Sequence, residues 1–429
     1  MKIKIREMKY EDVLALPIPK RKKPKHPGIL LNTLIRVLAV SDLKETQFTY
    51  KKIGMERLGK KEPCLILMNH SSFIDLKIAS AIFYPRPYNI VCTSDGFVGK
   101  DWLMRHIGCI PTKKFVTDTA LVRDMLYAVK KLKSSVLLFP EASYSFDGTA
   151  TPLPESLGKC LKMLDVPVVM IRSYGAFARD PLYNNLQLRD VKVTAEVEYL
   201  LSPEDIRSKS TEELNEILKT QFSFDNFRWQ QENNIHIAEE FRADCLNRVL
   251  YKCCHCGTEG KMVGKGIAVS CGNCGVSYEL TEQGFLRAAE GETRFTHIPD
   301  WYVWERQCVR EELEQGTYKL DVAVDIYMMV DTKCVYKIGD GRLQHTTDGF
   351  RLTGCEGKLD YSQKPSASYS LYSDYYWYEI GDMICIGNTD ALYYCFPKEG
   401  GDVVAKTRLA AEELYKLTRK RKGHSATED

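Results

Sequence analysis

The chain has 429 residues, of which 44% are apolar and 27% charged, with a formal net charge of +3. These values are ordinary for globular domains and exclude a disordered or collagen-like chain, and the length accommodates two or three domains. No run approaches the roughly 18 uncharged apolar residues of a spanning helix, and the first residues lack the apolar segment of a signal peptide. Fifteen cysteines in such a chain indicate a reducing cytosol with metal-bound or free thiols.

The N-terminal segment, residues 1–45, is basic and then apolar. Residues 1–27 contain nine Lys or Arg against three Asp or Glu, most densely over Lys20–Lys25. Residues 28–40 predict a helix with a few polar residues on one side and a broad apolar face on the other. A basic run beside a short apolar helix is typical of a segment that lies on an anionic membrane surface. The alternative is a helix packed on the protein's own core, and no reading motif favours nucleic acid.

Short apolar runs alternate with helical patterns within residues 46–250. The predicted strands are Leu65–Met68, Asn89–Thr93, Cys109–Thr112, Val136–Phe139, Val166–Ile171 and Val191–Leu200. The predicted helices are Leu76–Phe83, Trp102–His106, Thr119–Lys133, Glu155–Leu164, Pro203–Phe222 and Phe224–Leu250. This alternation predicts an α/β domain with a mainly parallel sheet, flanking helices and a working site at the strand ends.

The first of these strands is followed by His70 and, five residues later, by Asp75. Ser71 or Ser72 is a candidate cap for the helix that follows. Positions five apart on one helix point about 140° away from each other, so His70 must lie in the loop if Asp75, in the first helical turn, is to reach it. The carboxylate would then orient one ring nitrogen and leave the other free as a base. A helix-capping or core histidine is the alternative interpretation, because this spacing also arises by chance.

Three further blocks lie on the predicted strands or at their ends: Gly108–Lys114, Phe139–Ser145 and Val166–Ile171. Parallel sheets place their ligands at such positions, although each block alone is also compatible with a turn, a loop acid or a buried strand. The order and intervals of all the blocks form a more specific pattern.

This pattern resembles the glycerolipid acyltransferase family, which includes the 1-acyl-glycerol-3-phosphate acyltransferases, over roughly residues 50–200. Asn69–Asp75 is similar to the family's NHxxxxD block and Phe139–Glu141 to its FPEG block, while Gly108–Lys114 and Val166–Val168 are similar to the second and fourth blocks. The resemblance implies transfer of a fatty acyl group from acyl-CoA or acyl carrier protein to a hydroxyl of a lysolipid-type acceptor. Together with the cysteine usage and the basic and apolar N-terminal segment, this predicts a cytoplasmic enzyme that is peripheral on the cytosolic face of a membrane.

By the same resemblance, His70 would be the general base and Asp75 its orienter, while Lys114, Glu141 and Ser143 would bind substrate. A positioned base accelerates attack by a weakly acidic hydroxyl by about 10²–10⁴-fold. The acceptor is itself the nucleophile, so no serine or cysteine of the protein is needed.

The sequence departs from the family at three positions. Lys114 stands where the family has arginine and lacks the bidentate fork suited to phosphate. Ala142 stands in place of a glycine able to take positive φ, and Tyr144 in place of an arginine of many members. 1-Acyl-glycerol-3-phosphate therefore competes with another lysophospholipid or lipid alcohol as acceptor, with Lys113 and Arg172 as further sources of positive charge. A non-catalytic lipid-binding or scaffold protein on the same fold is the alternative function.

Residues 251–290 contain two CxxCG knuckles with 14 residues between Cys256 and Cys271. Four thiolates in this arrangement suit tetrahedral zinc, with unrelated thiols or a redox pair as the alternatives. A closed site of this kind is structural, so no catalysis is expected there. The predicted zinc ligands are Cys253, Cys256, Cys271 and Cys274, with Cys254 and His255 as spacers.

Residues 291–429 are rich in β-branched and aromatic residues and predict a β-rich domain with a helix over Val403–Leu417 and a basic tail, Arg419–Lys422. Its tyrosines and tryptophans are interpreted as sheet packing rather than as a ligand cage. Regulation or partner binding is expected of the ribbon and this domain. A nucleic-acid-associated role through the ribbon and the tail is a further alternative.

Overall fold

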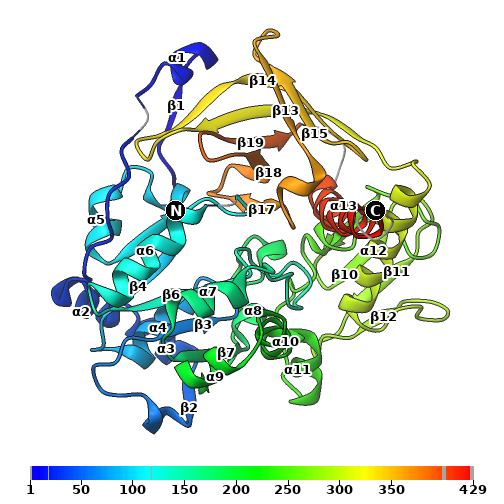
Figure 1. Cartoon of the computed structure of the whole chain (residues 1–429). Coiled ribbons are helices and arrows are strands. Elements are labelled where there is room, and N and C mark those ends of the chain that lie inside the picture. Colours follow the sequence, from blue (N-terminus) through cyan, green and yellow to red (C-terminus); the bar gives the residue numbers. More distant parts are fainter. Residues whose placement is uncertain (1, 18, 117, 399–401, 426–429) are drawn as a thin grey trace.

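Three β-sheets organise the computed structural model, which describes residues 2–17, 19–116, 118–398 and 402–425 (Figure 1). The first sheet has the order β2-β8-β7-β3-β6-β4-β5, with β3 at its centre. Its strands are β2 (Thr49–Ile53), β3 (Leu65–Met68), β4 (Tyr88–Thr93), β5 (Cys109–Thr112), β6 (Ser135–Leu138), β7 (Val168–Tyr174) and β8 (Thr194–Leu201). The strands from β7 to β5 run parallel, whereas β8 is antiparallel to β7. The mainly parallel sheet predicted from the sequence is therefore confirmed.

Helices cover both faces of this sheet, and alternate residues of β3 therefore point into two different cores. Ile66 and Met68 pack in one core with Ile78. Leu65 and Leu67 pack in the other, against α6 and α7. The helices of this domain are α2 (Ile29–Leu38), α3 (Val40–Glu45), α4 (Asp75–Phe83), α5 (Asp101–His106), α6 (Thr119–Lys130), α7 (Leu157–Leu164), α9 (Pro203–Ser208) and α10 (Thr211–Phe222). A central strand that is buried on both faces reads as a continuous apolar run, as it does here.

Two of the predicted helices are shorter than expected. The predicted helix 203–222 is divided because Ser210 starts a second helix with a capping box. The predicted helix 224–250 is only α11 (Asn226–Glu232), after which the backbone is irregular as far as a short 3-10 turn, Leu246–Arg248. Asn234 and Cys245 take left-handed backbone angles in this stretch, which a helix does not tolerate.

The second sheet belongs to the cysteine-rich region and has the order β12-β11-β10-β9. Its antiparallel strands are β9 (Met262–Lys265), β10 (Ala268–Cys271), β11 (Ser277–Leu280) and β12 (Leu286–Ala288). A helix that the sequence analysis missed follows, α12 (Ile298–Glu314), inside the region expected to be β-rich. Its buried residues Trp301, Glu305 and Val309 recur at helical spacing, which is the signal that identifies it.

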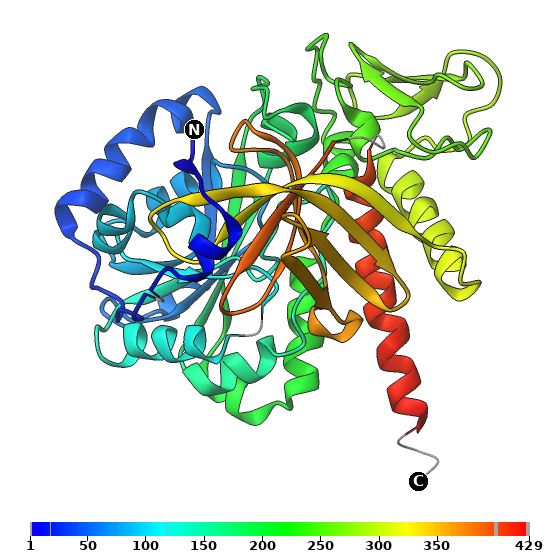
Figure 2. The same cartoon turned by 90° about the horizontal axis from the view of Figure 1, so that it is seen from above.

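The third sheet lies over the α/β domain (Figure 1) and has the order β16-β15-β14-β13-β19-β18-β17. Its strands are β13 (Leu320–Met329), β14 (Val335–Thr346), β15 (Gly349–Gly354), β16 (Leu359–Gln363), β17 (Tyr372–Trp377), β18 (Gly381–Gly387) and β19 (Leu392–Pro397). The N-terminal strand β1 (Ile5–Glu7) joins this sheet beside β14. Figure 2 shows α13 (Val403–Ser425) beside α12. This helix continues through the predicted basic tail, and residues 426–429 lie outside the described residues.

The third sheet and the α/β domain share a hydrophobic core. Phe146, from the loop after β6, stacks on Tyr375 of β17 with ring centroids 4.5 Å apart, and Phe177 and Tyr183 join the same core. No helix within the described residues is both long and apolar enough to cross a membrane. The packing brings β17 to the end of the first sheet where the candidate catalytic residues lie.

Candidate active site

The pair His70 and Asp75 is assembled at the end of β3, with His70 in the loop and Asp75 in the first turn of α4. The Nδ1 atom of His70 lies 3.1 Å from Oδ2 of Asp75. The same oxygen accepts the backbone N–H groups of Ser71 (2.9 Å) and Ser72 (3.1 Å). This geometry is the one predicted from the spacing. The helix N-cap is Ile74, with no side-chain cap, so capping by either serine is not observed.

The His70 ring is held between two aromatic rings, Phe139 at 4.2 Å and Tyr144 at 4.1 Å between centroids. Burial lowers the pKa of His70, and the hydrogen bond and charge of Asp75 only partly oppose this effect. The imidazole is therefore neutral near pH 7, which is the state required of a base. Its Nε2 atom has no hydrogen-bond partner among the described residues, and His70 lines a large cavity.

Glu141 is buried and points toward the loop that contains His70, and it does not line the cavity. Its Oε2 accepts the backbone N–H of His70 at 2.9 Å, and its Oε1 accepts the backbone N–H of Thr151 at 2.9 Å. Burial raises the pKa of Glu141 to about 7. Ser143 is also buried, with its Oγ 3.2 Å from the guanidinium of Arg408 on α13. Neither Glu141 nor Ser143 lines the cavity, so the structure places both behind it.

The three departures from the family pattern have distinct structural consequences. Ala142 takes a left-handed φ of 55°, so alanine occupies the conformation for which the glycine was expected. Tyr144 covers one face of the His70 ring. Lys114 lines the cavity and places its Nζ 4.2 Å from the centroid of the Tyr372 ring.

The two other cations named from the sequence, Arg172 and Lys113, already have partners in the structure. Arg172 binds Glu196 (3.2 Å) and Glu198 (2.7 Å) on β8 and does not line the cavity. Lys113 donates to the carbonyl of Thr389, 2.5 Å away in the β18–β19 turn. Lys113 and Lys114 both line the cavity without an ion pair in the described part of the chain, and Lys114 is the one whose ammonium is not hydrogen-bonded to a backbone carbonyl there.

The cavity has a volume of about 1470 Å³ and two walls. One wall comes from the α/β domain and includes His70 and Lys114. It continues into an apolar region formed by side chains of β6, α6 and α7, namely Leu121, Val122, Met125, Leu138, Leu157 and Cys160. The other wall comes from β17 and the turn after it, and includes Tyr372, Asp374, Trp377 and Tyr378.

The β17 wall was missed as part of the site by the sequence reasoning. The only available signal was the aromatic run Ser368–Tyr378, which was interpreted as sheet packing. That interpretation holds for Tyr375 and Trp377, which are buried in hydrophobic cores. Asp374 and Tyr378, in contrast, are only partly buried and face the cavity.

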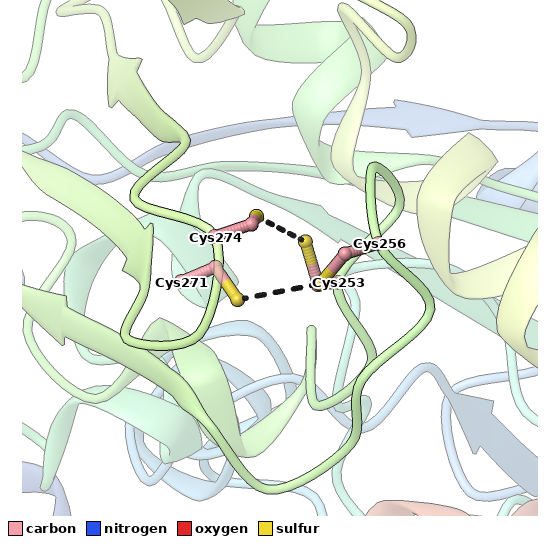
Figure 3. A group of neighbouring side chains, drawn as sticks. All are labelled: Cys253, Cys256, Cys271 and Cys274. Carbon is pink, nitrogen blue, oxygen red and sulfur yellow. Dashed lines mark hydrogen bonds between the residues drawn. The ribbon is translucent and has the colours of Figure 1, made fainter.

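The four predicted zinc ligands converge in a second, separate cluster (Figure 3). All four sulfur atoms lie within 4.8 Å of one another, with Cys253 and Cys274 3.7 Å apart and Cys256 and Cys271 3.8 Å apart. Tetrahedral zinc with Zn–S bonds of about 2.3 Å requires sulfur separations of about 3.8 Å, so the residues fit the metal. Cys254 lies outside the cluster, 3.2 Å from the Tyr278 hydroxyl. The cluster can therefore hold a metal ion.

Comparisons with known proteins match part of the chain to a known family. Residues 50–173 match the family model named Acyltransferase, a range that includes His70, Asp75, Lys114, Glu141 and Ser143. No curated protein matches the chain. Among solved structures, the chain is similar to the 1-acyl-sn-glycerophosphate acyltransferase PlsC from Thermotoga maritima, with 16% identity and a TM-score of 0.34. This similarity covers 45% of this chain and 81% of that chain. Residues 50–173 form an acyltransferase-family domain.

Proposed function

We propose that the protein transfers a fatty acyl group from acyl-CoA or acyl carrier protein to a hydroxyl of 1-acyl-glycerol-3-phosphate or a related lysophospholipid. The observation that carries the proposal is the neutral His70, oriented by Asp75, with its Nε2 atom available at a large cavity. The acyltransferase-family match of residues 50–173 supports the reaction class.

In the proposed reaction, His70 Nε2 takes the proton of the acceptor hydroxyl while the hydroxyl oxygen attacks the thioester carbonyl. The new C–O bond forms, the C–S bond breaks, and the imidazolium returns the proton to the leaving thiolate. Asp75 holds Nδ1 and stabilises the transient positive charge on the ring. The charge of Asp75 is itself held by the amides of Ser71 and Ser72, so the pair needs no rearrangement during the reaction.

The apolar region of the cavity supports a lipid substrate. Leu121, Val122 and Met125 of α6 form one side of it, and Leu138 and Leu157 form another. Each buried methylene of an acyl chain gains about 0.8 kcal/mol, so such a surface would hold a fatty acyl group. The region is continuous with the part of the cavity that His70 lines.

A peripheral position on a membrane is supported by α2. Leu30 is 83% exposed and Leu38 64% exposed on this helix, which packs beside α4 at the cavity. The basic run beside it is partly engaged with the protein itself, since Arg21 binds Asp118 and Asp124. We therefore expect apolar insertion by α2 to contribute more to membrane binding than charge does.

We further propose that the cysteine cluster holds structural zinc, since four thiolates form a closed site with no position for substrate.

The decisive experiment incubates the purified protein with acyl-CoA or acyl carrier protein and a panel of lysolipids and measures ester product. His70→Ala should lower kcat by about 10²–10⁴-fold without changing the melting temperature. The matched control is His236→Ala, which removes an exposed histidine paired with Glu282 and away from the cavity. Equal turnover in wild type and His70→Ala would refute the catalytic assignment, and lipid binding without turnover would favour the scaffold function.

The membrane proposal is tested by sedimentation with vesicles that contain anionic lipid. Leu30→Ser with Leu34→Ser should weaken vesicle binding, because both side chains are exposed on α2. The control is Leu188→Ser, which removes an exposed leucine from a loop outside α2 and should leave vesicle binding unchanged. Unchanged binding of the double variant would exclude α2 as the contact.

A further inference from the structure

Strand β17 places an aromatic and a charged side chain at the cavity, at alternate positions along the strand. Tyr372, Ser373 and Asp374 pair in register with β18. Side chains two apart on a strand lie on the same face, so Tyr372 and Asp374 both face the cavity, about 7 Å apart along the strand. The register then shifts between Asp374 and Trp377.

The backbone beyond the register shift is strained. Tyr376, Tyr378 and Glu379 all take left-handed φ angles, of 53°, 47° and 66°. Such angles are uncommon for residues other than glycine and gather at ligand sites, where surrounding structure holds them in place. Bulges of this kind change the direction of side chains next to active sites. Here the strained turn brings Tyr378 to the cavity.

The two walls place opposite charges side by side. Lys114 from the α/β domain lies over the Tyr372 ring, and Asp374 is the next residue on the same face of β17. Asp374 accepts one backbone N–H, from Tyr375, and no side chain within the described ranges forms an ion pair with it. Burial raises the pKa of Asp374 to about 7, and the charge of Lys114 opposes that rise. Lys114 therefore acts on Asp374 only through space, and no cation within the described residues forms a hydrogen bond with the carboxylate.

A second carboxylate makes this part of the cavity more acidic. Asp95 is buried against β17, where its Oδ2 accepts the Tyr372 hydroxyl at 2.5 Å and the Trp377 Nε1–H at 3.3 Å. Its Oδ1 has no hydrogen-bond partner within the described residues. Asp95 and Asp374 therefore line the cavity together with Lys114 and Lys113, and the ammonium of Lys113 is already hydrogen-bonded to the Thr389 carbonyl.

We propose that the β17 wall selects a zwitterionic lysophospholipid as acyl acceptor, with Lys114 holding the phosphodiester and Asp374 holding the ammonium group of the headgroup. The inference rests on the proposed acyl transfer and names the acceptor class for the same site. Ethanolamine and choline headgroups share this chemistry, since each places an ammonium group a few bonds from a singly charged phosphate. The ring of Tyr378 provides an additional surface for a cation.

A phosphomonoester fits this site less well. It carries a charge of about −1.5 to −2 at pH 7, against Lys114 and the already hydrogen-bonded Lys113, neither of which has a bidentate fork. Asp374 and Asp95 would repel that charge, because both line the same cavity. A singly charged phosphodiester has less to neutralise, and its ammonium group supplies the missing partner of Asp374.

The test compares kcat/KM for four acceptors with the same acyl chain: 1-acyl-glycerol-3-phosphate and its ethanolamine, choline and glycerol diesters. The two zwitterionic acceptors should exceed the monoester and the glycerol diester by about tenfold, and Asp374→Asn should remove most of that advantage. Lys114→Met should weaken all four acceptors while preserving the advantage. Asp348→Asn, in an exposed turn away from the cavity, is the control.

Calorimetric binding of short-chain forms of the four lysolipids to the His70→Ala protein measures headgroup choice without turnover. A preference for the monoester, or an unchanged ratio in Asp374→Asn, would overturn the headgroup assignment. Absence of acyl transfer to every acceptor would refute the proposed reaction instead, while the calorimetric ratio would still decide the role of Asp374. Unequal affinities for the ethanolamine and choline forms would show which of the two headgroups the site accepts.

Discussion

The two walls of the cavity are built on different physical principles. On the α/β wall, Oδ2 of Asp75 accepts three hydrogen bonds and Glu141 holds the backbone of His70 and of Thr151, while Oδ1 of Asp75 has no hydrogen-bond partner within the described residues. On the β17 wall, Asp374 accepts a single backbone N–H and the backbone that follows takes left-handed angles, while Asp95 packs against this wall from the α/β domain with its Oδ1 unpartnered within the described residues. The comparison shows that hydrogen bonds fix the position of the His70–Asp75 pair on one wall, whereas Asp374 on the other wall is held by a single backbone N–H, and the two proposed roles differ accordingly.

The largest effect is expected from disrupting the proposed zinc site, which lies in residues 251–290 and thus, along the sequence, between the α/β domain and the sheet that contains β17. Structural zinc contributes about 10–16 kcal/mol in small zinc domains. Cys253→Ser with Cys256→Ser should abolish bound zinc and remove hydrogen-exchange protection from residues 251–290. Protection over residues 50–173 should remain, because that domain has two cores of its own.

Cys254→Ser is the matched control for the metal, since this cysteine lies in the same knuckle but outside the cluster. It should retain one zinc per chain by elemental analysis. Loss of zinc in this variant, or retention in the double variant, would contradict the assigned ligand set.

The next largest effect is expected at the α/β wall. Asp75→Asn keeps the shape of the side chain and removes its charge, so we expect kcat to fall by roughly 10²–10⁴-fold. Asp75 raises the pKa of His70 against the effect of burial. The variant should therefore shift the acid limb of the kcat/KM profile to lower pH. An unshifted limb would mean that another group controls the ionisation.

A smaller effect with the opposite sign is expected at the β17 wall. The pKa of Asp374 is about 7 in the folded protein and about 3.9 in an unfolded chain. The carboxyl group therefore costs folding free energy above pH 4, and this cost grows until the pH passes 7. Asp374→Asn should thus gain about 1–2 kcal/mol more stability over wild type at pH 8 than at pH 5.

Denaturant titrations at the two pH values measure this difference. The charged groups that act on Asp374 are Lys114, Asp95 and Asp382, and all three remain in the variant. A pH-independent difference would show that Asp374 does not titrate in this range. Greater stability together with poorer use of zwitterionic acceptors would confirm that the two walls differ as described.

The smallest effect is expected at Ala142, where the α/β wall itself contains strain. The left-handed φ of Ala142 costs an alanine about 1–2 kcal/mol, whereas glycine adopts this angle freely. Glycine in turn costs about 0.5–1 kcal/mol of stability, because it loses more conformational entropy on folding than alanine does. Ala142→Gly should therefore stabilise the protein by up to about 1 kcal/mol in thermal unfolding. Ala178→Gly, in the short helix Ala176–Arg179, should destabilise the protein instead.

The sequence identified features whose partners lie close along the chain. The strand β3, the loop position of His70 and the first-turn position of Asp75 follow from a spacing of five residues and the geometry of a helix. The two cysteine knuckles follow in the same way from the local geometry of metal ligation. The prediction of a helix over residues 224–250 is wrong, since only Asn226–Glu232 is helical. The rest of this segment contains residues that are compatible with a helix, but tertiary packing stabilises an irregular backbone instead.

What the sequence by itself determined was one wall of the cavity, with its α/β sheet and His–Asp pair, and, apart from the cavity, a four-cysteine cluster. Only the tertiary structure decided that Glu141 and Ser143 do not line the cavity and that β17 closes it. The hydrogen bond between Asp95 and Tyr372 joins residues 277 positions apart. Contacts of this kind leave no periodic or short-range pattern in the chain, because they depend on how separately formed sheets dock against each other.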